Sequence, residues 1–356
     1  GSYSYSINGG TSWQGSGNFT NLIPGTYNIR IRDAAHTGCI IALNPAVIIT
    51  EPVALSATLL KTNVTCFGAA NGSIIINGAA GGYGTYEYTV NGGTSWQASN
   101  SFPGLAPGFY NVKIRDAANP ACIFTINGSV NVTEPPVLNA NIARTNITCN
   151  GAANGTITIS SPSGGYGTYQ YSINGGGAWQ ASGSFSGLAP GNYNVQIRDA
   201  AQTACVIVLN PALAITEPAI LAATVTPTNV SCFGANNGII AITGASGGYG
   251  TYEYSITGGA GWQASGSFSG LAPATYNVQI RDAANITCVI VLNSSVTITE
   301  PAVLNAAIAS TNISCNGTND GTISVTSPTG GYGTFEYSNN GGTSWQASGN
   351  FINLIP

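Results

Sequence analysis

The stretch GLAPGFYNVKIRDAANPACIFTI, residues 104–126, decides the fold of this chain. A Pro-Gly turn leads into FYNVKIRD, in which apolar and polar side chains alternate, and such alternation indicates a half-buried β-strand. A polar turn then leads to Cys122 and a second run rich in β-forming residues. No segment of useful length carries an apolar period of 3.6 residues, so we expect an all-β protein.

The same stretch returns every 83 residues without an insertion or deletion. All tryptophans and all cysteines obey this step: Trp13, Trp96, Trp179, Trp262 and Trp345; Cys39, Cys122, Cys205 and Cys288; Cys66, Cys149, Cys232 and Cys315. This period is longer than that of short solenoid repeats and is about the size of a small domain. We therefore expect a tandem array of similar domains.

The recurrent tripeptide TEP marks the expected boundaries, because proline cannot extend a β-ladder and forces the preceding residue to be extended. The predicted segments are a partial repeat at 1–52, complete repeats at 53–135, 136–218 and 219–301, and a partial repeat at 302–356. Within each complete repeat, about seven short strands, one of them a short TSWQAS segment, are separated by turn signals. This pattern predicts an antiparallel β-sandwich.

The composition excludes several classes of protein. Only 6% of the 356 residues are charged and the net charge is −4, so no basic surface is available for nucleic acid. No apolar run approaches the ~20 residues that span a bilayer. Regularly spaced cysteines without CxxC pairs are typical of an oxidising, extracellular compartment.

The phrase LAPGFY at residues 105–110, which returns as LAPGNY and LAPATY, is similar to the tyrosine corner of immunoglobulin-like domains. In that corner a tyrosine at the start of a strand forms a hydrogen bond back across the preceding turn. An ordinary Pro-Gly turn before a strand is the alternative.

A larger set of motifs resembles one family. A cysteine, an Asn-Gly-rich turn, a GGYG segment followed by Y-x-Y, the stretch quoted above and a closing TEP together resemble the SprB-type repeats of Bacteroidota surface proteins, named for a gliding-motility adhesin. The resemblance covers every complete repeat and both partial ones, although the insert around each tryptophan is longer than in shorter members. It implies Ig-like domains in the shaft of a secreted cell-surface filament, exported by type IX secretion, for gliding motility or adhesion.

The expected partners are neighbouring repeats of the same chain, bundled copies and surface polysaccharide. An array of carbohydrate-binding modules is the alternative function, because a tryptophan ring offers a flat face on which a sugar can stack. We expect the rings instead to be buried in a core or an interface, where Trp179→Ala would cost about 3 kcal/mol or more. A row of exposed rings would favour the carbohydrate alternative.

Catalytic chemistry is not expected. His36 is the only histidine and has no counterpart in the other repeats, so no Ser-His-Asp or Cys-His set can be assembled. No cofactor is expected either. The recurrent Arg-Asp pairs, such as Arg115-Asp116, are predicted to be structural caps or salt links, and a calcium site formed by Asp116 with Glu134 is the alternative.

Cysteine is the only residue suited to cross-linking, because Lys61 and Lys113 are the only lysines. Two cysteines flank each sandwich, and closing a loop of that length stabilises by ~4 kcal/mol in the chain-entropy model. We therefore predict Cys66–Cys122, Cys149–Cys205 and Cys232–Cys288, which leaves Cys39 and Cys315 unpaired. Pairing across the junction, Cys39–Cys66 and onward, is the alternative.

A longer period underlies the first. The residue after the first cysteine of each repeat alternates: Phe67, Asn150, Phe233 and Asn316. Two further positions alternate in step, so either the structural unit is a pair of repeats or a two-repeat gene segment was duplicated. In the first case we expect Phe67 and Phe233 to pack on an adjacent domain, and the asparagines to face solvent or form a polar contact.

Overall fold

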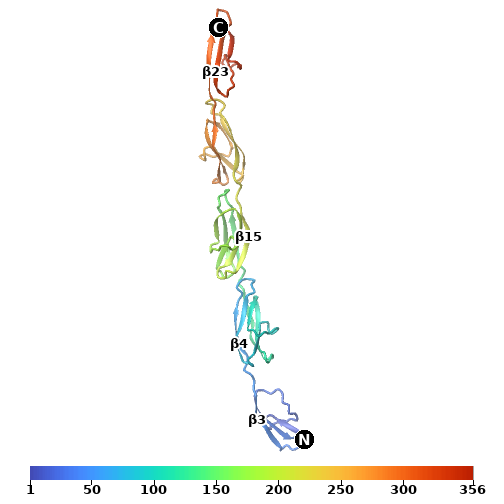
Figure 1. The fold of residues 1–356 in the computed structure, drawn as a ribbon. Helices are drawn as coiled ribbons and strands as arrows, with labels where there is room; N and C mark the ends of the chain where they lie inside the picture. The colour runs from blue at the N-terminus through green and yellow to red at the C-terminus, as the bar shows by residue number, and fades with distance from the viewer. Residues whose placement is uncertain (356) are drawn as a thin grey trace. The chain divides into compact units, whose positions relative to one another are not determined.

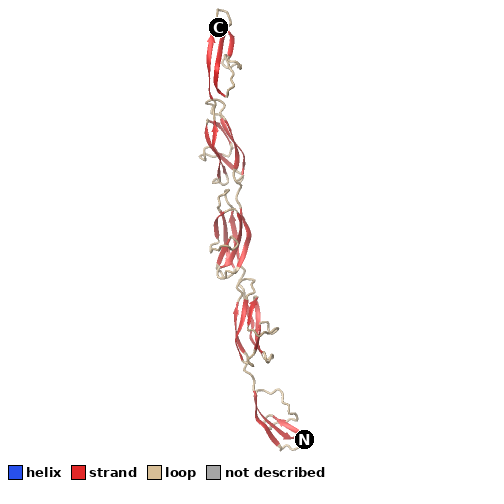
Figure 2. Ribbon diagram, in the orientation of Figure 1, coloured by secondary structure: helices blue, strands red, loops and turns tan. Residues whose placement is uncertain are grey.

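The computed structural model describes residues 1–355, and all of its regular structure is β-strand (Figure 1, Figure 2). No helix occurs among these residues, and hence none that could cross a membrane. The prediction of an all-β chain is confirmed. By its internal contacts the chain divides into two compact units: Gly1–Asn139 with Pro162–Tyr169 and Arg198–Ile207, and the remaining described residues.

A complete repeat contains six strands in two three-stranded sheets. In the first they are β4 (Ser56–Thr62), β5 (Gly72–Ala80), β6 (Tyr86–Thr89), β7 (Ser101–Leu105), β8 (Gly108–Asp116) and β9 (Ile123–Val132). The sheet orders are β4-β5-β7 and β6-β8-β9, with antiparallel pairs throughout. Both sheets contribute buried side chains to one core: Ile74 and Ile76 from the first, Val112 and Ile114 from the second. Each complete repeat is therefore a β-sandwich.

The next two repeats have the same strands at the same places. They are β10 (Asn139–Thr145), β11 (Gly155–Ser163), β12 (Tyr169–Ser172), β13 (Ser184–Leu188), β14 (Gly191–Asp199), β15 (Val206–Ile215), β16 (Ala222–Thr228), β17 (Gly238–Ser246), β18 (Tyr252–Ser255), β19 (Ser267–Leu271), β20 (Ala274–Asp282) and β21 (Val289–Ile298). Their sheets are β10-β11-β13, β12-β14-β15, β16-β17-β19 and β18-β20-β21.

The partial repeats each form one sheet. The first holds β1 (Tyr3–Ser6), β2 (Gly25–Asp33) and β3 (Ile40–Ile49), which correspond to β6, β8 and β9. The last holds β22 (Ala302–Thr311), β23 (Gly321–Gly331) and β24 (Asn350–Leu354), which correspond to β4, β5 and β7.

The segment around each tryptophan differs from the expectation. TSWQAS is not a strand: it is a turn held by a single bridge, in the first complete repeat between Tyr88 and Gln97. The short run SFPGL is instead strand β7, which pairs with β5. The tight NGG turn brings the chain back too early for a full ladder, so each sandwich has six strands rather than about seven.

The tyrosine corner is present in each complete repeat. The Tyr110 hydroxyl donates a hydrogen bond to the Ala106 carbonyl over 2.8 Å, and Tyr193 and Tyr276 do the same to the residue four positions earlier. The phrase LAPGFY therefore fixes the turn between β7 and β8, as the resemblance implied.

The chain enters a sandwich at one end, here called proximal, and leaves it at the other, here called distal. Strand β4 runs from the proximal to the distal end, so Cys66, which follows it, lies distally, where the Val64 N–H donates to the Thr133 carbonyl over 2.9 Å. The last strand, β9, also runs from proximal to distal. Cys122, which precedes β9, therefore lies at the proximal end.

The predicted pairing within a repeat is wrong for this reason. The ten residues of β9 separate the two ends, and at about 3.3 Å per residue they span ~30 Å. A disulfide requires Cα atoms no more than about 7 Å apart. Neither Cys66–Cys122 nor its equivalents Cys149–Cys205 and Cys232–Cys288 can form without unfolding the sandwich.

Candidate functional site: the disulfide junctions between repeats

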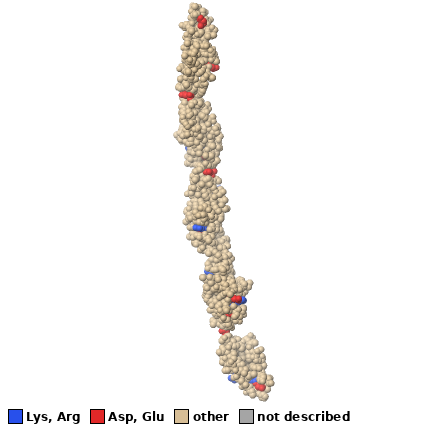
Figure 3. All heavy atoms as spheres, in the orientation of Figure 1, with Lys and Arg blue, Asp and Glu red and all other residues tan. Residues whose placement is uncertain are grey.

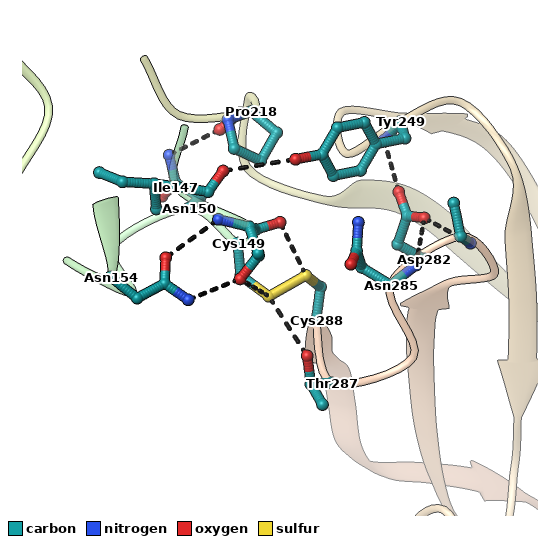
Figure 4. Close-up of a disulfide and its surroundings, with 12 residues drawn as sticks. Ile147, Cys149, Asn150, Asn154, Pro218, Tyr249, Asp282, Asn285, Thr287 and Cys288 are labelled. Atoms are coloured by element: carbon teal, nitrogen blue, oxygen red, sulfur yellow. Dashed lines mark hydrogen bonds between the residues drawn. A yellow bond between two sulfur atoms is a disulfide. The ribbon is translucent and has the colours of Figure 1, made fainter. Parts of the chain in front are cut away.

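Two disulfides each join one repeat to the next. They are Cys66–Cys205 and Cys149–Cys288, both with a sequence separation of 139 residues and a Cα–Cα distance of 5.3 Å. The distal cysteine of one sandwich thus bonds the proximal cysteine of the following sandwich (Figure 4). The alternative pairing Cys39–Cys66 is also wrong, because Cys66 is bonded to Cys205 and Cys39 is free.

The glutamate of TEP holds the loop that carries the distal cysteine. The Gly68 N–H donates to Glu134 Oε2 over 2.6 Å, and the Thr65 N–H donates to Asn71 Oδ1 over 3.0 Å. The same glutamate contact returns at 2.7 Å as Gly151 to Glu217 and Gly234 to Glu300. The glutamate of TEP is therefore a clamp for the cysteine loop.

A buried aspartate holds the loop that carries the proximal cysteine. Asp116 is fully buried; its Oδ2 accepts the Tyr83 N–H over 2.5 Å, and its Oδ1 accepts the N–H groups of Ala118 and Asn119. The Asn119 carbonyl in turn accepts the Cys122 N–H over 2.9 Å. The Asp of each Arg-Asp pair is thus a loop cap. Its neighbour Arg115 pairs with Glu87 over 2.6 Å, because adjacent strand residues face opposite sides.

The bonded junction shows how these two loops meet (Figure 4). Asp282 holds the proximal loop by accepting the Tyr249 N–H, and the hydroxyl of Tyr249 donates to the Ile147 carbonyl of the preceding repeat over 3.3 Å. Tyr332 makes the equivalent bond to Val230 over 2.5 Å. The tyrosine of GGYG therefore connects repeats. Sequence reasoning missed this role, although the strict return of GGYG was the signal for it.

Each bonded junction encloses a small cavity beside the sulfur atoms. The cavity at Cys66–Cys205 measures about 210 Å³ and is lined partly by Phe67, which remains 56% exposed. The equivalent cavity at Cys149–Cys288 measures about 200 Å³, and there Asn150 donates to the Pro218 carbonyl over 3.1 Å. The expected packing of Phe67 and Phe233 on an adjacent domain is therefore wrong, because both rings are mostly exposed, whereas Asn150 makes the polar contact that was expected. Phe233, 59% exposed, lies beside the unbonded Cys232.

Acid is expected to loosen the proximal loop. The hydrogen bond from the Tyr83 N–H has the largest influence on the pKa of Asp116 and lowers it from its ordinary value. Burial raises this pKa, and the hydrogen bonds from the N–H groups of Asn119 and Ala118 lower it further. A carboxylate with a lowered pKa stabilises the fold above its unfolded pKa, and this contribution is lost as pH falls from about 4 through the folded pKa. The Tyr83 amide should lose protection from hydrogen exchange, corrected for the intrinsic rate, over that range.

Asp116→Asn supplies the test of this assignment. It should remove the protection of the Tyr83 amide already at neutral pH and abolish its dependence on acid, because an amide oxygen replaces only one of the two acceptors. Glu87→Gln is the matched control, since Glu87 belongs to a partly exposed pair with Arg115. Unchanged Tyr83 protection in Asp116→Asn would contradict the capping role.

The tryptophan rings are not buried, which corrects the expectation of core packing. Trp13, Trp96 and Trp262 are half-buried, and each lies under an arginine of the neighbouring strand at 4.4–4.6 Å from the ring centroid. Trp179 is also half-buried, and Trp345 is 60% exposed. The rings belong to the surface of the second sheet rather than to the core.

The remaining candidate residues lie apart from one another. Asp116 and Glu134, named for a calcium site, are at opposite ends of one sandwich. His36 is exposed beside Asp33. Among residues 1–355 no group of three or more His, Cys, Asp and Glu side chains is placed to hold a metal. Four cysteines are free and exposed: Cys39, Cys122, Cys232 and Cys315.

Two solved structures are similar to this chain at low identity. Three N-terminal domains of the bacteriophage RB49 outer capsid protein Hoc are 12% identical, with 69% of this chain and 100% of that chain covered at a TM-score of 0.31. The S-layer protein rSbsC is 11% identical, with 100% of this chain and 63% of that chain covered at a TM-score of 0.22. Among curated proteins none matches.

The repeat family itself matches four times. The matched segments begin near the start of each first sheet and end in the turn before the tryptophan: 58–95, 141–178, 224–261 and 307–344. Their spacing is that of the sequence repeat, and the first three lie within the complete sandwiches. The chain is therefore an array that contains four SprB repeats.

Proposed function

We propose that this chain is a load-bearing part of the shaft of an extracellular, cell-surface filament that serves adhesion or gliding motility and is exported by type IX secretion. The SprB repeats support the surface location, since the family is named for an adhesin of this kind. Disulfides support an oxidising compartment. The proposal assigns no catalytic step and no cofactor to the chain.

The observation that carries the proposal is the overlap of the two disulfides. Cys66–Cys205 and Cys149–Cys288 interleave in sequence, so three backbone segments run in parallel between them: residues 66–149, 149–205 and 205–288. A bond within a sandwich would strengthen that sandwich alone. Bonds between sandwiches instead carry tension past each junction, which suits a shaft.

The surface also fits exposure outside the cell. Charged side chains are few, and on the face drawn in Figure 3 they do not gather into a patch of one sign. The sequence contains eight Lys and Arg residues and no Met, so few sites exist for trypsin-like proteases or for methionine oxidation. A nearly uncharged surface gives little attraction for nucleic acid.

Stretching a single molecule tests the load-bearing role. With every domain unfolded, the reduced chain should extend the 222 residues between Cys66 and Cys288 to about 800 Å. In the oxidised chain the shortest route between the two disulfides is the 56 residues from Cys149 to Cys205. The same region should therefore extend to only about 200 Å. Equal extensions in the two states would contradict the proposed role.

Carbohydrate binding remains the second candidate, because the tryptophan rings lie at the surface. The observation against it is that Arg115 covers one face of Trp96, with the guanidinium 4.6 Å from the ring centroid. Trp96→Ala is expected to cost about 1–2 kcal/mol, from lost cation–π contact and apolar burial, rather than the ~3 kcal/mol expected of a core residue. Thermal denaturation measures that cost.

Retention on immobilised polysaccharide separates the two candidates. A shaft predicts no retention of the wild-type chain and no change in Trp96→Ala. A carbohydrate-binding array predicts retention that falls when Trp96 and its equivalents are replaced. Arg115→Gln is a useful companion variant, because it uncovers the ring without removing it.

A further inference from the structure

The two cavities beside the junction disulfides have nearly the same volume but different chemistry. The first, of about 210 Å³, lies at Cys66–Cys205, and the second, of about 200 Å³, lies at Cys149–Cys288. The residues that line each cavity all belong to one compact unit of the chain. Because the two cavities occupy equivalent places in the repeat, each serves as a control for the other.

The first cavity has an apolar lining to which two repeats contribute. The preceding repeat supplies Phe67 and Pro135, and the following repeat supplies Pro136, Leu138, Val206 and Ile207. The rest of the lining consists of the disulfide, a glycine and an alanine. None of the lining side chains that the structure describes carries a charge, an amide or a hydroxyl group. A water molecule in this cavity would therefore find no side chain with which to form a hydrogen bond.

Polar groups line the equivalent cavity of the second junction. Asn150 stands where the first cavity has Phe67, and Thr287 stands where it has Ala204. The Asn150 side chain donates to the Pro218 carbonyl over 3.1 Å (Figure 4). The Thr287 hydroxyl lies 3.7 Å from one sulfur of the disulfide. Because an amide and a hydroxyl offer hydrogen bonds to water, the second cavity suits water better than an apolar molecule.

The size and the lining of the first cavity suit a single apolar ring. Apolar cavities of about 150 Å³ exclude water and bind molecules of the size of benzene. Pockets for drug-sized ligands begin at about 300 Å³, so this cavity is too small for them. The Phe67 ring and the two prolines present flat faces, on which an aromatic ring can stack. A charged molecule is disfavoured, because the apolar lining offers its charge no partner.

Phe67 leaves the cavity accessible from solvent. Its ring is 56% exposed although it lines the cavity, whereas Leu138 on the other repeat is 6% exposed. Phe67 therefore lies at the entrance and Leu138 belongs to the inner wall. A ligand that covers a mostly exposed aromatic ring removes apolar surface from water, which favours binding.

We propose that the cavity at Cys66–Cys205 is a binding site for a small uncharged aromatic molecule, and that the equivalent cavity at Cys149–Cys288 is not. The site goes beyond the load-bearing role and does not depend on it. It gives a chemical meaning to the alternation of Phe and Asn after the first cysteine of each repeat, because the phenylalanine provides a stacking face and the asparagine a polar group. Since both repeats line the cavity, a bound molecule also stabilises their contact.

Titration of the full oxidised chain with toluene, followed by NMR of isotopically labelled methyl groups, tests the site. The methyl signals of Leu138 and Ile207 should shift to saturation with a Kd of about 1 mM or lower. Those of the equivalent residues Leu221 and Ile290 should not shift. Benzoate carries the same ring with a charge and should bind about 10-fold more weakly or less. Equal shifts at both junctions, no saturation below about 5 mM toluene, or equal affinity for benzoate would overturn the proposal.

Exchanging the residues that distinguish the two cavities provides matched variants. Phe67→Asn should weaken toluene binding about 10-fold or more, because it removes the stacking face. Phe109→Asn is the control, since Phe109 is 73% exposed and does not line the cavity. Asn150→Phe combined with Thr287→Ala should create saturable shifts at the second junction. Peptide mapping without reductant verifies that each variant keeps both disulfides. Unchanged binding in Phe67→Asn, or no binding at the exchanged second junction, would also overturn the proposal.

Discussion

A protease site inserted after Gly177 is expected to be cut without dividing the oxidised chain. Gly177 lies in an exposed turn between Cys149 and Cys205, and both disulfides span it. After cleavage, two of the three parallel backbone segments still connect Cys66 to Cys288. The cut chain should therefore migrate as one species on a denaturing gel and separate into two fragments only after reduction.

Equivalent turns provide a graded set of controls. Insertions after Thr94 and Ala260 are each spanned by one disulfide, Cys66–Cys205 and Cys149–Cys288 respectively, so these chains should also stay whole. An insertion after Thr343 is spanned by neither, and its cleavage should release a fragment at once. Alkylating the free thiols first prevents exchange.

Cysteine variants complete the design. With Cys66 and Cys205 both changed to serine, a cut after Thr94 should divide the chain, whereas a cut after Gly177 should still leave it whole. Separation of the cut wild-type chain without reductant would show that the bonds between repeats do not form. A filament built in this way survives a single break in its backbone at any position spanned by a junction bond.

The sequence predicts the fold well, because strand alternation and turn residues are local signals. The run FYNVKIRD became β8, and the tyrosine of LAPGFY forms the expected bond to Ala106. The disulfide pairing failed for a reason that is not local. Both cysteines of a repeat belong to one sandwich, and the distance between them depends on the direction of each strand. Following the direction of each strand in turn, up to the last one, places Cys122 at the proximal end and Cys66 at the distal end.

The tryptophans show a second limit. Their regular spacing indicates a structural role but does not distinguish a core from a stacked surface position. The contact that distinguishes a surface position from a core position is the stacking of Arg115 on the Trp96 ring. The equivalent arginines lie over Trp13 and Trp262. That contact depends on how a turn folds back over a strand. Neither composition nor spacing carries that information.

Gly247→Ala is expected to destabilise the proximal end of its repeat strongly. Gly247 is the first glycine of GGYG, has a φ of +82°, and its added Cβ would lie 2.0 Å from the backbone carbonyl oxygen of Ile220. That oxygen is backbone and cannot rotate away, so the chain must shift. The left-handed conformation costs about 1 kcal/mol and the overlap adds about 3 kcal/mol, for a total of about 4 kcal/mol.

The destabilisation caused by Gly247→Ala should extend to the junction with the preceding repeat, because the next two residues, Gly248 and Tyr249, hold the proximal loop and that junction. The Gly248 N–H donates to the Ala219 carbonyl over 2.9 Å, and the Tyr249 hydroxyl donates to Ile147 of the preceding repeat. Gly250→Ala is the matched control: its φ is +90°, and nothing lies within 4 Å of its added Cβ, so only the ~1 kcal/mol of conformational strain applies. Hydrogen exchange of the Gly248 and Tyr249 amides in the full oxidised chain measures both variants. Similar losses in the two would show that conformational strain alone, rather than close approach to the Ile220 carbonyl, requires glycine at position 247.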